Sequence, residues 1–299
     1  MTTFYRRLPK FDYVAPGSIE EAWKLMAGER GVDYDLFAGG TDVLPKLKRR
    51  QAPAPKVLID LKRIGGLDEI HYDDRRGLVI GALATVHAVT RSPLIRERFP
   101  VLAMAAERIA ATQIQHRATV VGNLCNAAPS ADTASALLAL EAEVRCASAA
   151  GERTLALRDF FRGPLQNALG AGEIVTEILV PRESAGAKSA YLKLCPRGRM
   201  DLAVVGVAAV LFARDGLCQD VRIGLGAVAP TPIRAAKAES ALRGAELTEA
   251  NIARAASAAV DESRPRDSIR GSAAYRRAMV GILVARAIDQ CLGRSCACQ

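Results

Sequence analysis

Two short glycine-containing segments hold the residues whose types and spacing could bind an anionic ligand. The first is FAGGTD at residues 37–42, where two adjacent glycines separate an apolar run from a basic one. The second is RATVVGN at residues 117–123, followed by a loop of small residues that ends in Asp132. Small residues let backbone amides approach a ligand, and amides left unpaired at a turn favour anions such as a diphosphate. Together the two segments indicate a large phosphate-bearing cofactor.

Neither segment matches a standard nucleotide-binding motif. The dinucleotide pattern needs a third glycine at fixed spacing, and the P-loop needs a Gly-Lys-Ser/Thr that follows neither segment. Taken alone, each segment is typical of a turn, and Asp132 with Thr133 would be an ordinary N-cap for the helix expected over 133–142. The structural alternative therefore stays open for each segment considered by itself.

Charge and composition limit the possible partners. The 299 residues are 50% hydrophobic and carry a formal charge of +9, so we expect a globular, basic protein of two domains. Seven Lys or Arg and one acid, Asp60, lie between Leu44 and Arg63, without the interleaved aromatics of single-strand binders. We expect a solvated face or a dock for an acidic partner there, and no nucleic-acid binding.

The sequence also carries no targeting or membrane signal. The first residues lack an apolar core of signal-peptide length, and no run approaches the ~20 residues of a membrane span. Seven scattered cysteines do not form a disulfide framework, and Cys291, Cys296 and Cys298 near the end lack partners spaced for zinc or a cluster. We expect a cytoplasmic protein with no metal site of its own and a disordered tail.

Hydrophobic periodicity and breakers place the elements around the first segment. Residues 17–28 predict a helix with Ser18 as N-cap, and 34–38, 56–62 and 77–82 read as strands. Two short helices are expected in 85–110, broken near Pro93 and Pro100. In the second segment, 118–122 reads as a strand.

A change of composition at residues 180–190 indicates a linker or a long hairpin loop. Beyond it, 189–194, 201–213 and 218–230 read as successive strands, and 248–262 and 273–292 as helices. A β-meander closed by helices makes a smaller α+β domain.

Four ordered stretches then resemble one flavoprotein family. They are LFAGGTDVLPKLKRR (36–50), TVVGNLCNAAPSADTASALLAL (119–140), YLKLCPRGRMDLAVVGVAA (191–209) and PRDSIRGSAAYRRAMVGILVARAI (265–288). They are similar to the FAD-binding medium subunits of molybdenum hydroxylases, the group of carbon monoxide dehydrogenase, xanthine dehydrogenase and hydroxybenzoyl-CoA reductase. The resemblance covers essentially the whole chain.

The resemblance implies an α+β fold of two domains. An FAD-binding domain of the vanillyl-alcohol-oxidase type would span 1–181, with lobes of roughly 1–60 and 61–181. A C-terminal α+β domain would span 187–292, and 293–299 would be a tail. This agrees with the composition change near Val180.

The resemblance also implies which residues bind FAD. The first loop would cradle the diphosphate, and Thr119, Gly122 and Asn123 would reach the phosphates and ribityl chain. Asp132 would accept from cofactor hydroxyls, Val175 and Ile109 would pack near the flavin, and Lys193 would tune it electrostatically; without the family, Lys193 reads as a strand lysine facing water. The full implied set is Leu36, Phe37, Ala38, Gly39, Gly40, Thr41, Asp42, Val43, Ile109, Thr119, Val121, Gly122, Asn123, Cys125, Asp132, Val175 and Lys193.

Three departures from the family pattern stand out. Val121 replaces the usual first glycine of the second loop, which puts close backbone approach there in question. Cys195-Pro196 stands where Ser or Gly followed by Arg is typical. The cysteine-bearing insertion that the reductase branch uses for an iron–sulfur cluster is missing between Asn123 and Cys146.

The implied function is electron transfer. Electrons from a molybdenum site in a large subunit would pass through iron–sulfur clusters of a small subunit to FAD on this chain. They would leave to NAD, oxygen or another acceptor, so no residue here would act on the organic substrate. One alternative is a stand-alone FAD oxidase or dehydrogenase of the same fold, which would need a substrate cavity with a general base or a covalent flavin link. The other is a docking subunit that has lost FAD.

Overall fold

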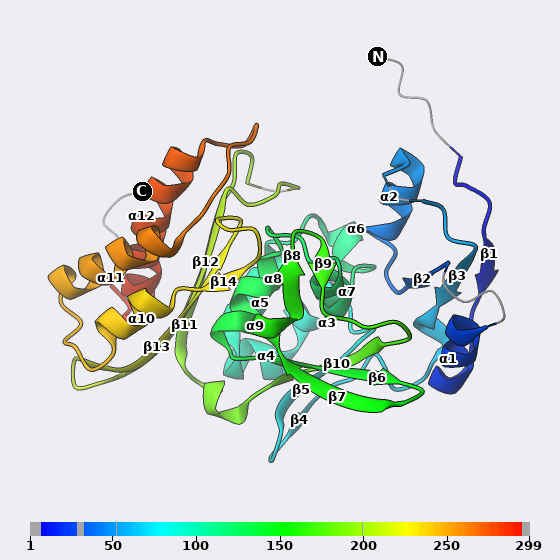
Figure 1. Ribbon diagram of the computed structural model, residues 1–299. Helices are drawn as coiled ribbons and strands as arrows, with labels where there is room; N and C mark the ends of the chain where they lie inside the picture. The colour runs from blue at the N-terminus through cyan, green and yellow to red at the C-terminus, as the bar shows by residue number, and fades with distance from the viewer. Residues whose placement is uncertain (1–6, 29–32, 52, 199, 295–299) are drawn as a thin grey trace.

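A computed structural model describes residues 7–28, 33–51, 53–198 and 200–294, which form three units in a row (Figure 1). The first lobe has a parallel sheet in the order β1 (Asp12–Val14), β3 (Val57–Asp60), β2 (Tyr34–Phe37). Its helices are α1 (Ile19–Ala27) and α2 (Val43–Arg49). The Ser18 hydroxyl accepts a hydrogen bond from the Glu21 amide, so the predicted N-cap of α1 is confirmed.

The central lobe is built on an antiparallel sheet in the order β4 (Ile70–Asp73), β5 (Gly77–Gly81), β10 (Ile174–Val180), β6 (Glu143–Ser148), β7 (Gly151–Ala156). A short pair, β8 (Phe161–Gly163) and β9 (Gln166–Asn167), lies beside it. Its helices are α3 (Val86–Arg91), α4 (Pro93–Arg98), α5 (Pro100–Glu107), α6 (Thr112–Gln115), α7 (Val120–Cys125), α8 (Asp132–Ala139) and α9 (Leu157–Phe160).

Two sequence-based expectations in this lobe are wrong. Region 85–110 holds three helices instead of two, because Pro93 and Pro100 each occupy the first turn of a new helix, where a missing N–H costs nothing. The expected strand at 118–122 is the start of α7, because the Thr119 hydroxyl caps the Gly122 amide at 3.0 Å. A local cap overrides the β preference of the two valines.

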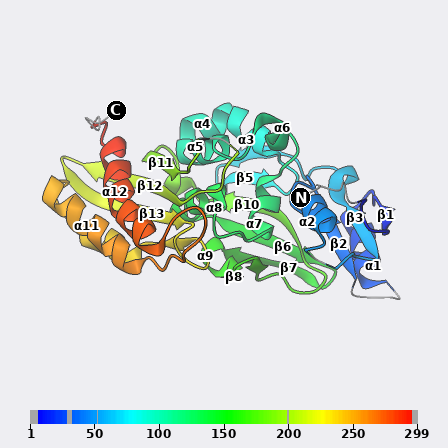
Figure 2. The ribbon, with the colours of Figure 1, turned by 90° about the horizontal axis from the view of Figure 1, so that it is seen from above.

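The C-terminal domain is a meander of β11 (Lys188–Leu194), β12 (Val205–Arg214), β13 (Leu217–Gly226) and the short β14 (Ile233–Arg234). The predicted helices α11 (Glu249–Glu262) and α12 (Ala273–Cys291) cover its outer face together with α10 (Ala236–Leu242), which the sequence pattern did not reveal (Figure 2). The predicted meander closed by helices is confirmed.

The inner face of this meander packs on the central lobe. Tyr191, Ala208 and Val210 belong to the same buried cluster as α5 and α8, whereas the alternate residues face the C-terminal helices. The sheet is therefore buried on both sides. The connection before this sheet contains the 3₁₀ turn η2 (Arg182–Ser184), which lies in the predicted linker. Another 3₁₀ turn, η1 (Leu61–Arg63), follows β3.

The first lobe shares its core with the central lobe. Ala22, Met26 and Ile59 pack with Leu83, which follows β5, and with Ile174, the first residue of β10. Within the described residues, no helix has the length and apolarity to cross a membrane. The C-terminal cysteines Cys296 and Cys298, and the predicted tail from residue 295, lie outside the described residues.

Candidate functional site

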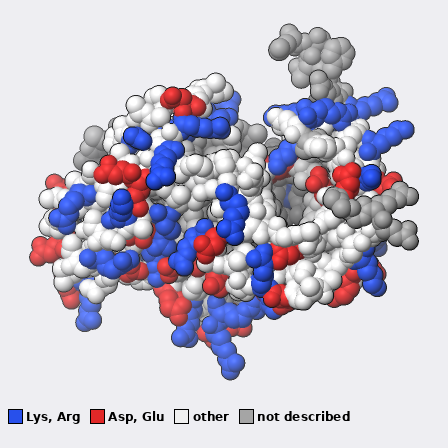
Figure 3. Space-filling model, viewed as in Figure 1, with Lys and Arg blue, Asp and Glu red and all other residues white. Residues whose placement is uncertain are grey.

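A cavity of about 810 Å³ lies between the first lobe and the central lobe, and both glycine loops line it. Figure 3 shows the surface hollowed at this seam. Its size falls within the range of small-molecule and cofactor pockets. The cavity brings together every residue of the predicted set except Phe37 and Lys193: Leu36, Ala38, Gly39, Gly40, Thr41, Asp42, Val43, Ile109, Thr119, Val121, Gly122, Asn123, Cys125, Asp132 and Val175.

The first loop depends on glycine at both positions. Gly40 has φ +72°, and a Cβ there would lie 2.4 Å from the Phe37 ring. A Cβ at Gly39 would lie 1.9 Å from the carbonyl oxygen of Arg117, the first residue of the second loop. The two loops therefore touch at Gly39. The Phe37 ring packs against the turn at Gly40, and the Lys62 ammonium lies 4.0 Å from the ring centre.

The first loop offers backbone donors to the cavity. Among the described residues, the amides of Gly39, Gly40, Thr41 and Asp42 donate no hydrogen bond to another protein group. Successive unpaired N–H groups in a turn are suited to phosphate oxygens. This donor set fits the diphosphate of FAD.

The second loop is organised around its helix cap. A Cβ at Gly122 would lie 2.8 Å from the Thr119 hydroxyl, so a larger residue there would disturb this cap. Val121 is 5% exposed and sits in the first turn of α7 with no positive φ, so the valine is accommodated without backbone strain. Asn123 accepts a hydrogen bond from the Thr133 hydroxyl at 2.8 Å, which fixes its amide at the cavity wall.

Asp132 is not the N-cap of α8. Ala131 occupies that position without a side-chain bond, and the Asp132 carboxylate accepts from the Tyr191 hydroxyl at 2.7 Å and from Lys193 Nζ at 2.8 Å. The Lys193 side chain is 2% exposed and also donates to the Arg108 carbonyl, so it does not face water. Burial raises the pKa of Asp132 and outweighs the opposing effect of the Lys193 ammonium. Burial and the neighbouring carboxylate raise the pKa of Tyr191 well above its usual value.

Several lining residues were missed by the sequence reasoning. Lys46 Nζ donates to Asn126 Oδ1 at 2.5 Å, and Asn126 in turn donates to Asp42 Oδ1 at 3.0 Å. Arg49 and the segment 200–202 of the C-terminal domain also line the cavity. The spacing of Lys46 one helical turn after Asp42 places these two side chains near each other, but it gives no signal for the contact with Asn126.

The apolar wall has little chemical reactivity. Ile109, Val175 and the buried Ile174 line it together with Cys125. Burial raises the pKa of the Cys125 thiol to about 12, so it stays protonated and packs as a small hydrophobe. Near neutral pH this wall would exclude water from a bound ring system.

The comparisons with known proteins agree with this architecture. Residues 9–183 match the family model described as FAD binding domain in molybdopterin dehydrogenase, and 189–291 match CO dehydrogenase flavoprotein C-terminal domain. The medium chain of carbon monoxide dehydrogenase from Hydrogenophaga pseudoflava is 36% identical over 96% of this chain and 98% of its own length. The nicotine 6-hydroxylase medium subunit of Paenarthrobacter nicotinovorans is 32% identical over 97% of this chain and 100% of its own.

Solved structures give the same result. A chain of carbon monoxide dehydrogenase from Hydrogenophaga pseudoflava superimposes with a TM-score of 0.91 at 37% identity, covering 96% of this chain and 99% of the other. A chain of quinoline 2-oxidoreductase from Pseudomonas putida 86 superimposes with a TM-score of 0.89 at 29% identity, covering 96% of this chain and 99% of the other.

Fold and cavity together define a two-domain flavoprotein. The chain belongs to the family of FAD-binding medium subunits of molybdenum hydroxylases, as its four motifs predicted, and it is an oxidoreductase subunit with an FAD-binding domain. The predicted family, fold class and cofactor are confirmed. The predicted domain limits and the roles of single residues stay predictions.

Proposed function

We propose that this chain carries FAD in the cavity between its first and central lobes and relays electrons within a heteromeric molybdenum hydroxylase. The observation that carries the proposal is the pair of glycine loops, which meet at Gly39 and both line one cofactor-sized cavity. Relatives similar over nearly their whole length are medium chains of carbon monoxide dehydrogenase and nicotine 6-hydroxylase. When bound, FAD supplies reversible one- and two-electron redox chemistry.

The chain's own residues then bind and insulate the cofactor. The unpaired amides from Gly39 to Asp42 would hold the diphosphate, and Asn123 would contact the ribityl chain. Asp132 would accept from a cofactor hydroxyl while Lys193 neutralises part of its charge. Val175 and Ile109 would exclude water from the ring. The Lys193 ammonium would favour negative charge gained nearby.

Electron donors and acceptors would come from outside this chain. We propose a small iron–sulfur subunit and a large molybdenum subunit as partners, NAD, oxygen or another carrier as acceptor, and a cytoplasmic location. The FAD-binding domain would end near residue 181 and the C-terminal domain would span 187–292.

The absorption spectrum of the purified chain, reconstituted with FAD and desalted, tests the cofactor. Flavin bands with about one FAD per chain are expected, and a chain that retains no flavin would overturn the proposal. Turnover of organic substrates by the isolated chain would instead favour a stand-alone oxidase. Iron and molybdenum in material co-purified from the native host would identify the partners.

The exposed end of α2 is the proposed dock for an acidic partner. Lys48 and Arg50 are exposed there, whereas Lys46 and Arg49 line the cavity. Reversing both exposed charges (Lys48→Glu with Arg50→Glu) should weaken assembly, measured by co-purification at two salt concentrations. The matched control reverses Arg214 and Lys237, exposed on the C-terminal domain. Equal assembly of both variants would refute the dock.

A further inference from the structure

Lys46 is one of two cationic side chains on the wall of the cavity among the described residues, the other being Arg49. It projects from α2, which follows the first glycine loop, and reaches Asn126 at the end of α7, the helix that contains Gly122 of the second. Its ammonium therefore lies between the two loops. Lys46 is half-buried, whereas its neighbours Lys48 and Arg49 are exposed.

Two acids of the cavity wall near Lys46 have no other basic partner among the described residues. Five acids line the cavity, and three of them have a basic partner: Asp132 with Lys193, Glu173 with Arg153 and Asp201 with Arg197. Asp35 and Asp42 form no ion pair within the described part of the chain. Burial raises the pKa of both, and the Lys46 charge opposes that rise in each case.

A doubly charged diphosphate beside the first loop would meet these two carboxylates. Unpaired amides can bind phosphate oxygens, but they do not remove the repulsion from Asp35 and Asp42. An ammonium held at the same place offsets it. The hydrogen bond from Asn126 to Asp42 keeps the Asn126 oxygen turned toward Lys46, so the ammonium is positioned in advance.

We propose that Lys46 is the counter-ion of the cofactor diphosphate, and that it makes the cavity select FAD over flavins without phosphate. This inference rests on the proposed function, because it assumes that the cavity binds a flavin. The Asn126 side chain is a positioning residue, which acts through Lys46. Such a role also explains why a cation lies at the seam of two lobes that already touch at Gly39.

The test measures the affinity of the full-length chain, freed of flavin, for FAD and for riboflavin, which has the same ring and no phosphate. In Lys46→Met, FAD binding should weaken about 10- to 100-fold while riboflavin binding stays within about twofold, as for loss of one charged hydrogen-bond partner. Lys46→Arg should restore most of the FAD affinity. Lys48→Met, on the same helix but exposed, is the matched control and should bind FAD as the wild type does.

Salt dependence provides a second readout that does not need riboflavin. FAD affinity of the wild type should fall with ionic strength, and the dependence should flatten in Lys46→Met but not in Lys48→Met. Unchanged FAD affinity in Lys46→Met, or equal losses for FAD and riboflavin, would overturn the role of Lys46. A wild-type chain that binds neither flavin would overturn the proposed function itself, which keeps the two failures apart.

Discussion

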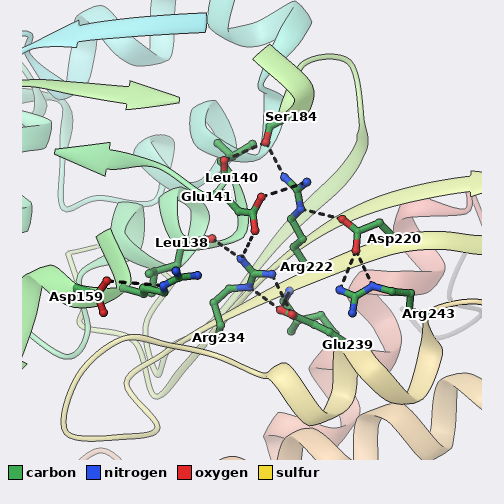
Figure 4. Close-up of polar contacts among 12 residues, drawn as sticks. Leu138, Leu140, Glu141, Asp159, Ser184, Asp220, Arg222, Arg234, Glu239 and Arg243 are labelled. Atoms are coloured by element: carbon green, nitrogen blue, oxygen red, sulfur yellow. Dashed lines mark hydrogen bonds and ion pairs between the residues drawn. The ribbon is translucent and has the colours of Figure 1, made fainter. Parts of the chain in front are cut away.

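Lys193 Nζ lies 2.8 Å from Asp132 Oδ2, and this buried ion pair joins β11 of the C-terminal domain to the first residue of α8. At the other end of α8, Glu141 lies 3.2 Å from Arg222 and 3.6 Å from Arg234 of the same sheet (Figure 4). Helix α8 is thus held to the C-terminal domain at both ends. Because Asp132 also lines the cavity, the position of that domain bears directly on the site.

Removing Lys193 should destabilise the chain strongly. Lys193→Met leaves the Asp132 carboxylate buried without its cation, so the free energy of unfolding should fall by about 3–5 kcal/mol in urea titrations. Lys188→Met, on the same strand but exposed, should change it by less than about 0.5 kcal/mol. Adding Asp132→Asn to Lys193→Met should recover part of the loss, and strict additivity would contradict the coupling.

Arg234 should matter more than the exposed arginines of the same domain. Its guanidinium pairs with Glu239, whose side chain is 6% exposed, and donates to the Leu138 carbonyl at the end of α8 (Figure 4). Arg234→Met should lower the free energy of unfolding by about 3 kcal/mol. Arg214→Met, whose pair with Asp215 is exposed, should have almost no effect in the same thermal or urea measurement. Equal losses of unfolding free energy in the two variants would show that burial does not determine how much each ion pair stabilises the chain.

Gly39→Ala should separate the two loops. The new Cβ would collide with the Arg117 carbonyl, which is backbone and cannot rotate away. Flavin retention by the purified variant should drop at least about tenfold, since the first loop can no longer reach the second. Gly65→Ala is the control, because a Cβ there meets nothing within 4 Å. Full flavin retention by Gly39→Ala would argue against a clamp made of both loops.

The first lobe should lose stability in acid through Asp60. Burial would raise the pKa of Asp60, but hydrogen bonds from Lys62 and from the Tyr13 hydroxyl outweigh it and hold the pKa below its usual value. The unfolded chain therefore takes up this proton first, so the contribution is complete above about pH 5 and is lost as the pH falls through the lower folded value. Between about pH 5 and pH 3, Asp60→Asn should lose less unfolding free energy than the wild type. An identical loss would assign acid sensitivity to other groups.

Local signals predicted the elements well where the deciding residues are close in sequence. Ser18 and the acids that follow it marked the start of α1, and the glycine pair marked a turn between β2 and α2. The cap at Thr119 is equally local, but Val120 and Val121 favour a strand, so pattern alone misassigned α7. The prolines were interpreted as breaks when they are the first residues of helices.

Long-range partners explain what the sequence could not predict at the site. From the sequence, Asp132 could be a helix cap, but its carboxylate accepts a hydrogen bond from Lys193, 61 residues away. Lys46 looked like part of a solvated basic run, but its partner Asn126 is 80 residues away. No spacing rule encodes such contacts, because they depend on how the lobes pack. The four family motifs identified the loops without revealing these side-chain partners.

The shared core at the seam has a thermodynamic consequence. The first lobe completes its small apolar cluster with Leu83 and Ile174 from the central lobe. Folding of the first lobe is therefore linked to its packing on the central lobe. A ligand that contacts both glycine loops stabilises this packed state by a free energy of RT ln(1 + [L]/Kd). Amide hydrogens of β2 and β3 should then exchange with solvent more slowly as ligand is added. The amides of β12, which is buried on both faces, should exchange only when the whole chain unfolds, with or without ligand.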